Sequence, residues 1–122
     1  MLFEIPDAVK NTAKFGLSLV EQGYPGGQQL GRIRGIQLST KNFIRLNDVR
    51  VIRNWFARHV YTSYPNYERW VKSDFNKDKI TPGVVAWLLW GGDAALDWVN
   101  SQQILNSLNN SYNTNYEPIT KS

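Results

Sequence analysis

One apolar stretch constrains the fold of this chain more than any other. Residues 81–99 read Thr-Pro-Gly-Val-Val-Ala-Trp-Leu-Leu-Trp-Gly-Gly-Asp-Ala-Ala-Leu-Asp-Trp-Val. Thr81 can cap a helix whose first position is Pro82, because the N–H that proline lacks has no partner in a first turn. The segment that follows is apolar on every side, so we predict a helix in the middle of a core.

A second helix is predicted directly after this one. Gly91 and Gly92 can adopt the left-handed backbone that ends a helix, and Asp93 is placed to cap the next one. Apolar residues then recur at helical spacing as far as Leu105. We therefore predict a central apolar helical hairpin over residues 82–105. A buried strand is the alternative for the apolar run, but the cap signals on both sides favour a helix.

The remaining chain predicts a single helical domain. A length of 122 residues suits one domain with a substantial core. Val49, Ile52, Phe56 and Val60 form the most regular amphipathic seam. We predict an all-α domain of four to six short helices over residues 1–108. Residues 109–122, rich in Asn and Ser, are predicted to form a flexible polar arm that packs little without a partner.

Composition narrows the environment in which the chain works. The absence of cysteine excludes a disulfide framework and fits a reducing compartment. No apolar run approaches the roughly 20 residues that span a bilayer, and the N-terminus lacks a secretory signal pattern. We therefore expect neither secretion nor a membrane partner.

Positive charge is concentrated in the middle of the chain. The net charge is +4, and all seven arginines lie between Arg32 and Arg69. A short helix from Thr40, followed by a helix from Asp48, would have the outline of a helix-turn-helix. The basic residues are therefore interpreted either as a nucleic-acid-binding face or as an ordinary solvated surface. If they bind nucleic acid, charge reversal at Arg50 and Arg53 should abolish that binding. The possible nucleic-acid contacts are Arg32, Arg34, Lys41, Arg45, Arg50 and Arg53.

The only histidine, His59, has a structural and a chemical interpretation. It suits a general base, but one histidine without cysteines does not make a zinc ligand set. We therefore predict no metal, no cofactor and no catalytic site, and we expect Arg58, His59 and Asp93 to form a buried polar clasp between helices. A small hydrolase built on His59 and Asp93 is the alternative, in which His59→Ala would remove activity without unfolding the protein.

A partial calcium-loop pattern occurs at Asp74, Asn76 and Asp78. The pattern then fails, because Lys79 stands where the loop needs glycine and Val85 stands where it needs a bidentate glutamate. We therefore do not predict a calcium site.

Two motifs resemble a small domain of tailed-phage head-region proteins, found in or beside portal and prohead-protease gene products. They are Phe56-Ala57-Arg58-His59 and the segment from Val85 to Asp93, and the similarity extends over most of the chain. The resemblance implies a non-enzymatic structural or head-associated protein, in the virion or the host cytoplasm, that contacts phage structural proteins or itself. Val60 stands where such sequences tend to carry an acidic residue, and an aromatic connector follows. The missing acid argues against an activity that needs it. The aromatic connector with Tyr61, Tyr64 and Tyr67, together with Tyr112 and Tyr116 near the C-terminus, favours a contact surface.

Overall fold

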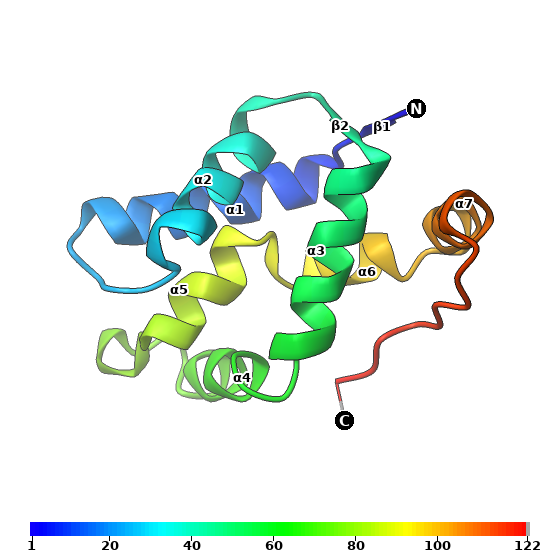
Figure 1. Cartoon of the computed structure of the whole chain (residues 1–122). Helices are drawn as coiled ribbons and strands as arrows, with labels where there is room; N and C mark the ends of the chain where they lie inside the picture. The colour runs from blue at the N-terminus through cyan, green and yellow to red at the C-terminus, as the bar shows by residue number, and fades with distance from the viewer. Residues whose placement is uncertain (122) are drawn as a thin grey trace.

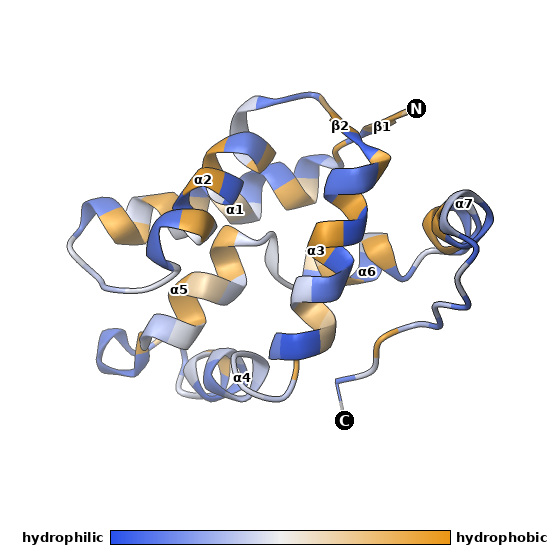
Figure 2. Cartoon of the chain, in the orientation of Figure 1, coloured by the Kyte–Doolittle hydropathy of each residue, from blue (hydrophilic) through white to orange (hydrophobic). Residues whose placement is uncertain are grey.

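Helix α5 (Pro82–Leu89) lies in the middle of the molecule, as its all-round apolar sequence predicts (Figures 1 and 2). The Thr81 hydroxyl accepts the backbone N–H of Val84 at 3.4 Å, which confirms the predicted cap. The indole of Trp87 enters a large core shared with the helix over residues 46–59 and with later helices. The opposite side of α5 enters a second, smaller core with the first and fourth helices. Because α5 contacts an apolar core on each side, its sequence has no polar face.

The computed structural model describes residues 1–121 and confirms the all-α prediction. Seven α-helices, one 3-10 turn and one two-stranded sheet occur in this range, so the helices outnumber the predicted four to six. The other elements are β1 (Leu2–Glu4), α1 (Asp7–Glu21), α2 (Gln28–Thr40), β2 (Phe43–Arg45), α3 (Leu46–His59), α4 (Tyr64–Lys72), η1 (Lys77–Lys79), α6 (Gly92–Val99) and α7 (Gln102–Tyr112).

Glycines bring α1 and α2 unusually close to α5. A Cβ atom on Gly16 of α1 would lie 2.8 Å from the backbone nitrogen of Leu89, and one on Gly35 of α2 would lie 2.8 Å from a Leu89 methyl carbon. Both distances are shorter than van der Waals contact. At Gly16 the obstacle is the main chain, so only glycine fits there, whereas at Gly35 it is the end of the Leu89 side chain, which would have to move. The packing of α5 therefore depends on small residues in its two neighbours.

The predicted helical hairpin over residues 82–105 is wrong as a unit. Gly91 and Gly92 do turn the chain, with φ values of +101° and +60°. However, α5 packs mainly on α1, α4 and α2, whereas α6 packs mainly on α1 and α3. The region also contains three helices, because Ser101 caps α7 separately. Asp93 does not cap α6, whose N-cap is Gly91. Two glycines allow the chain to change direction without bringing the flanking helices together.

The predicted short helix from Thr40 is also wrong. Residues 43–45 form a strand that pairs with β1 in antiparallel register, with Leu2 opposite Arg45. The partner strand lies about forty residues away in sequence, so no local pattern reveals it. Without a helix at this place the outline of a helix-turn-helix disappears.

The C-terminal arm lies against the domain, which contradicts the prediction that it packs little. Helix α7 reaches Tyr112, and residues 113–121 then run back beside α3 without regular secondary structure (Figure 1). The Asn109 amide bonds both backbone groups of Tyr116, at 3.0 and 2.7 Å, and the Thr114 hydroxyl at 2.9 Å. The Asn100 amide bonds both backbone groups of Ile119. An asparagine-rich composition predicts disorder, but here Asn100 and Asn109 hold the arm against the domain.

Asn109→Ala is expected to loosen the arm. The substitution leaves the backbone N–H and C=O of Tyr116 without their partners, which costs about 1–2 kcal/mol. We expect faster proteolytic cleavage after residue 112 and a lower unfolding midpoint in urea. Asn110→Ala, an exposed neighbour on the same helix, is the control. Equal cleavage rates in the two variants would show that Asn109 does not hold the arm.

Candidate functional site

The predicted clasp of Arg58, His59 and Asp93 is not formed. His59 is half-buried at the end of α3, where its Nδ1 lies 2.9 Å from the carbonyl oxygen of Trp55. A carbonyl oxygen can only accept, so Nδ1 carries the proton and Nε2 has no partner among the described residues. Arg58 is exposed, and within residues 1–121 it makes no hydrogen bond or ion pair.

Asp93 has other partners on a different part of the surface. Its carboxylate accepts the Trp87 indole N–H at 3.0 Å and the Lys121 ammonium at 3.1 Å. Since His59 bonds the backbone of its own helix, the two residues form no pair. The His59–Asp93 pair required by the hydrolase alternative is therefore absent from the described residues.

Lys121 connects the arm to this carboxylate. Burial opposes the charge of the ammonium, but the hydrogen bond and the charge of Asp93 outweigh that effect and raise the pKa of Lys121. Because the pKa of Lys121 is higher in the folded chain than in the unfolded chain, its ion pair with Asp93 stabilises the fold at neutral pH. This stabilisation is lost as the pH rises above 10.5 and through the pKa of the folded state. The ammonium also lies 5.0 Å from the ring centroid of Tyr64. At neutral pH this contact helps to hold the end of the arm.

Three of the six predicted nucleic-acid contacts are engaged inside the protein. Arg34 is buried, lies 3.4 Å from Asp48 and also bonds Gln37. The guanidinium carbons of Arg50 and Arg53 each lie 4.1 Å from a tyrosine ring of the C-terminal region, Tyr112 and Tyr116 respectively. Burial lowers the pKa of Arg53, partly offset by Tyr116. Charge reversal at Arg50 and Arg53 would therefore disturb the arm and would not isolate nucleic-acid binding. The three that remain exposed are Arg32, Lys41 and Arg45.

Most of the predicted tyrosine contact surface is also used internally. The rings of Tyr64 and Tyr67 lie 5.3 and 6.2 Å from Trp87, and burial raises the pKa of both phenols. Tyr112 and Tyr116 stack on arginines, as described above. Of the five tyrosines only Tyr61 is strongly exposed, at 66%. The aromatic connector thus serves mainly to build the core.

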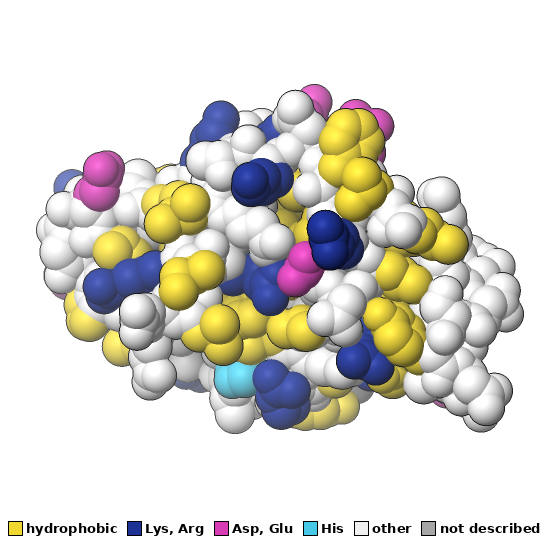
Figure 3. Space-filling model, turned by 45° about the horizontal axis from the view of Figure 1, so that its top comes forward, with side chains coloured by type: hydrophobic (Ala, Val, Ile, Leu, Met, Phe, Trp, Pro, Cys, Tyr) yellow, Lys and Arg dark blue, Asp and Glu magenta, His cyan; other side chains and the backbone are white. Residues whose placement is uncertain are grey.

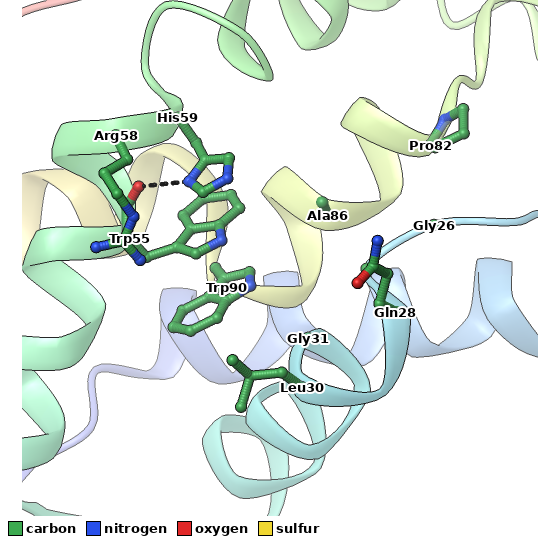
Figure 4. A pocket seen from close by; sticks show the side chains of 11 residues that line it. Gly26, Gln28, Leu30, Gly31, Trp55, Arg58, His59, Pro82, Ala86 and Trp90 are labelled. Atoms are coloured by element: carbon green, nitrogen blue, oxygen red, sulfur yellow. Dashed lines mark hydrogen bonds between the residues drawn. The ribbon is translucent and has the colours of Figure 1, made fainter.

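A pocket of about 400 Å³ opens between the N-terminus of α2, the C-terminus of α3 and α5 (Figure 4). The indoles of Trp55 and Trp90 are stacked in its wall, 4.9 Å apart and within 9° of parallel. The His59 imidazole stacks on Trp55 at 4.4 Å, on the side away from Trp90. The remaining lining residues are Gly26, Gly27, Gln28, Leu30, Gly31, Arg58, Pro82 and Ala86.

An exposed apolar stripe begins at this pocket and continues along α2. Leu30, Ile33 and Ile36, which we call the α2 stripe, are 61%, 56% and 52% exposed. Figure 3 shows hydrophobic side chains exposed over α2, with the single histidine at the edge of the same face. The inward face of α2 carries Gly31, Arg34, Gly35 and Leu38 instead.

Physical constraint explains why α2 turns its apolar side outward. The inward face approaches Leu89 of α5, and a Cβ atom at Gly35 would displace the end of the Leu89 side chain. The spacing of Gly31 and Gly35, four residues apart, indicates such a close approach in the sequence itself. This spacing identifies the face of α2 that lies against α5.

The described residues offer little for metal chemistry. Among residues 1–121 no group of three or more His, Asp or Glu side chains is placed to hold a metal ion. In the partial calcium pattern, the Asn76 side-chain oxygen accepts the backbone N–H of Asp78 at 2.9 Å and so caps η1. In the same range, no helix combines the length and the apolar character that crossing a bilayer requires.

No protein-family model matches this chain, and no curated protein or solved structure matches it either. The phage context therefore stays a prediction that rests on the two sequence motifs.

Proposed function

We propose that this chain is a non-enzymatic phage structural or head-associated protein that acts through contacts with other proteins during virion assembly. The observation that supports this function is the α2 stripe together with the adjoining pocket. Isolated exposed apolar residues are common, but a row of them beside an aromatic-walled pocket is typical of a surface that another molecule covers. The phage setting comes from the sequence resemblance alone.

Covering the α2 stripe would stabilise a complex appreciably. Full burial of one Leu or Ile side chain stabilises by about 1.5–3 kcal/mol, and each of these three is a little more than half exposed. Together they would contribute about 3–5 kcal/mol before the costs of association, by the same rule. This gain only approaches the lower end of the cost of association, about 4 kcal/mol, so the adjoining pocket would also have to contribute.

Nucleic-acid binding is the alternative function, and it has less support. Of the six predicted contacts only Arg32, Lys41 and Arg45 are exposed, because Arg34, Arg50 and Arg53 are engaged within the chain. Binding to DNA or RNA should weaken steeply with salt and should fall in Arg32→Glu and Lys41→Glu. A salt-titrated binding assay with double-stranded DNA, single-stranded DNA and RNA tests this alternative.

Ile33→Asp is expected to reduce virion assembly without unfolding the protein. Ile33 is in the middle of the α2 stripe and more than half exposed, so a carboxylate there stays in water when the chain is alone but opposes burial at a contact. In a phage that encodes this chain, we expect at least a tenfold lower yield of complete particles. The purified variant should keep its melting temperature within about 2 °C, as surface substitutions usually do.

Gln29→Asp, which puts the same charge on an exposed polar position of α2, is the control and should leave particle yield unchanged. Mass spectrometry of purified particles should detect the chain if it is a component of the virion. Normal particle yield from Ile33→Asp would contradict the proposed function.

A further inference from the structure

We propose that the pocket and the α2 stripe bind an acidic amphipathic helix of a partner protein, with one apolar side chain in the pocket and a neighbouring carboxylate at Arg58. The inference rests on the proposed function, since it specifies the chemistry of the contact. Three features of the surface carry it: the shape and lining of the pocket, the charges at its rim, and the spacing of the stripe.

The pocket suits a large apolar side chain. Its volume of about 400 Å³ lies in the range of known binding pockets, about 300–1,000 Å³. Trp55 and Trp90 supply a rigid aromatic wall, and Pro82, Ala86 and Leu30 add apolar surface (Figure 4). Rigid aromatic walls lose little conformational entropy on binding, which is why such pockets hold the anchor residues of an interface.

The rim of the pocket is positive and has nothing to neutralise it. None of the lining residues is Asp or Glu. The Arg58 guanidinium forms no ion pair within residues 1–121, and the Nε2 atom of His59 points to no protein partner in that range. Arg32 is exposed on α2 as well. A carboxylate on the incoming segment would find charge-assisted donors in Arg58 and Arg32, whereas a basic segment would be repelled. The unprotonated Nε2 of His59 can accept a hydrogen bond from that segment but cannot donate one.

The stripe favours a helix as the occupant. Leu30, Ile33 and Ile36 are three residues apart, so the stripe extends for about 9 Å along α2 at 1.5 Å per residue. A partner helix presents apolar side chains once per turn, about 5.4 Å apart, and can fill the pocket with one while the next covers the stripe. This is the usual arrangement of a helix in an apolar groove.

A second copy of this chain fits the same surface poorly. In an interface with twofold symmetry the same patch supplies both sides, so Arg32 and Arg58 of both copies would enter one contact. Like charges that face each other at an interface oppose association. The occupant is therefore expected to be a different polypeptide of opposite charge.

Selection of peptides on the full-length protein tests the inference. The probe is a library of random 16-residue peptides displayed on a carrier, selected against the folded chain at moderate salt. We expect enriched sequences that combine Asp or Glu with Leu, Phe or Trp at helical spacing. A synthetic peptide of the enriched type should bind at least tenfold more weakly to Arg58→Glu and to Ile33→Asp.

Arg45→Glu is the matched control, because it makes the same charge change at an exposed position outside the pocket and should leave peptide affinity unchanged. Melting temperatures of all variants verify that they are folded. The inference is overturned by no enrichment, by enrichment of basic or uncharged peptides, by equal affinity in Arg58→Glu and wild type, or by self-association of the wild-type chain that Ile33→Asp abolishes. Oligonucleotide binding that Arg58→Glu removes would overturn it as well.

The two proposals fail in different ways. If Ile33→Asp lowers particle yield but the selected peptides lack acidic residues, the assembly function stands and the acidic partner is wrong. If acidic peptides bind the pocket but Ile33→Asp leaves particle yield normal, the surface binds acidic helices outside virion assembly.

Discussion

Trp87→Ala is expected to lower the free energy of unfolding by about 3–5 kcal/mol, the range found for aromatic truncations in cores. Trp87 is fully buried, at 0% exposure, and its ring meets the edge of Phe56 at 4.9 Å. Alanine would leave a large cavity between α5 and α3, because neighbours that are themselves packed can close it only in part. A loss of this size is a large fraction of the total stability of a small domain.

Urea denaturation followed by far-ultraviolet circular dichroism measures the loss. Trp98→Ala, a half-buried tryptophan of α6, is the control and should cost clearly less. Trp87→Phe separates packing from hydrogen bonding, since phenylalanine fills most of the space but cannot donate to Asp93. Its expected cost is about 1–2 kcal/mol. Equal losses in Trp87→Ala and Trp98→Ala would show that the core is not centred on α5.

Gly16→Val is expected to destabilise the fold by about 3 kcal/mol, at the upper end of the cost of overpacking a core. The Cβ atom would lie 2.8 Å from the backbone nitrogen of Leu89 and 3.0 Å from the carbonyl carbon of Leu88. Both are main-chain atoms of α5, which cannot move aside as a flexible side chain can. The substitution should therefore push α1 and α5 apart and disturb both cores.

Gly31→Ala is the matched control for this effect. A Cβ atom there would be 3.5 Å from the nearest side-chain atom of Trp90, which is ordinary contact. Replacing glycine by alanine inside a helix otherwise stabilises by up to about 1 kcal/mol, so we expect opposite signs for the two glycines. The unfolding midpoints of both variants in urea decide the point. A Gly16→Val variant as stable as the wild type would contradict the close approach of α1 and α5.

Local sequence signals were sufficient for the parts of the fold that depend on neighbouring residues. The all-round apolar run, Thr81 and Pro82 located α5 in the core, because helix caps and hydrophobic periodicity act over one or two turns. The seam from Val49 to Val60 located the buried face of α3 for the same reason. Gly91 and Gly92 ended α5 where their left-handed backbone is needed.

The candidate site could be predicted only in fragments. Arg58 and His59 were singled out, but their expected partner Asp93 bonds Trp87 and Lys121 instead. The pocket brings together α2, α3 and α5, three segments far apart in the chain. Residue types suggest which groups can interact, but several partners are chemically acceptable for each, and the sequence does not choose among them.

What the sequence determined by itself was therefore the helical class, the central helix and the positions where it begins and ends. Tertiary structure alone decided the pairing of β1 with β2, the docking of the C-terminal arm and the outward direction of the α2 stripe. These features depend on contacts between segments that are distant in the sequence. The stability of such contacts comes from how well the two surfaces pack together. For α2, Gly31 and Gly35 let the inward face lie close to Leu89, and this docking leaves the isoleucines at the surface.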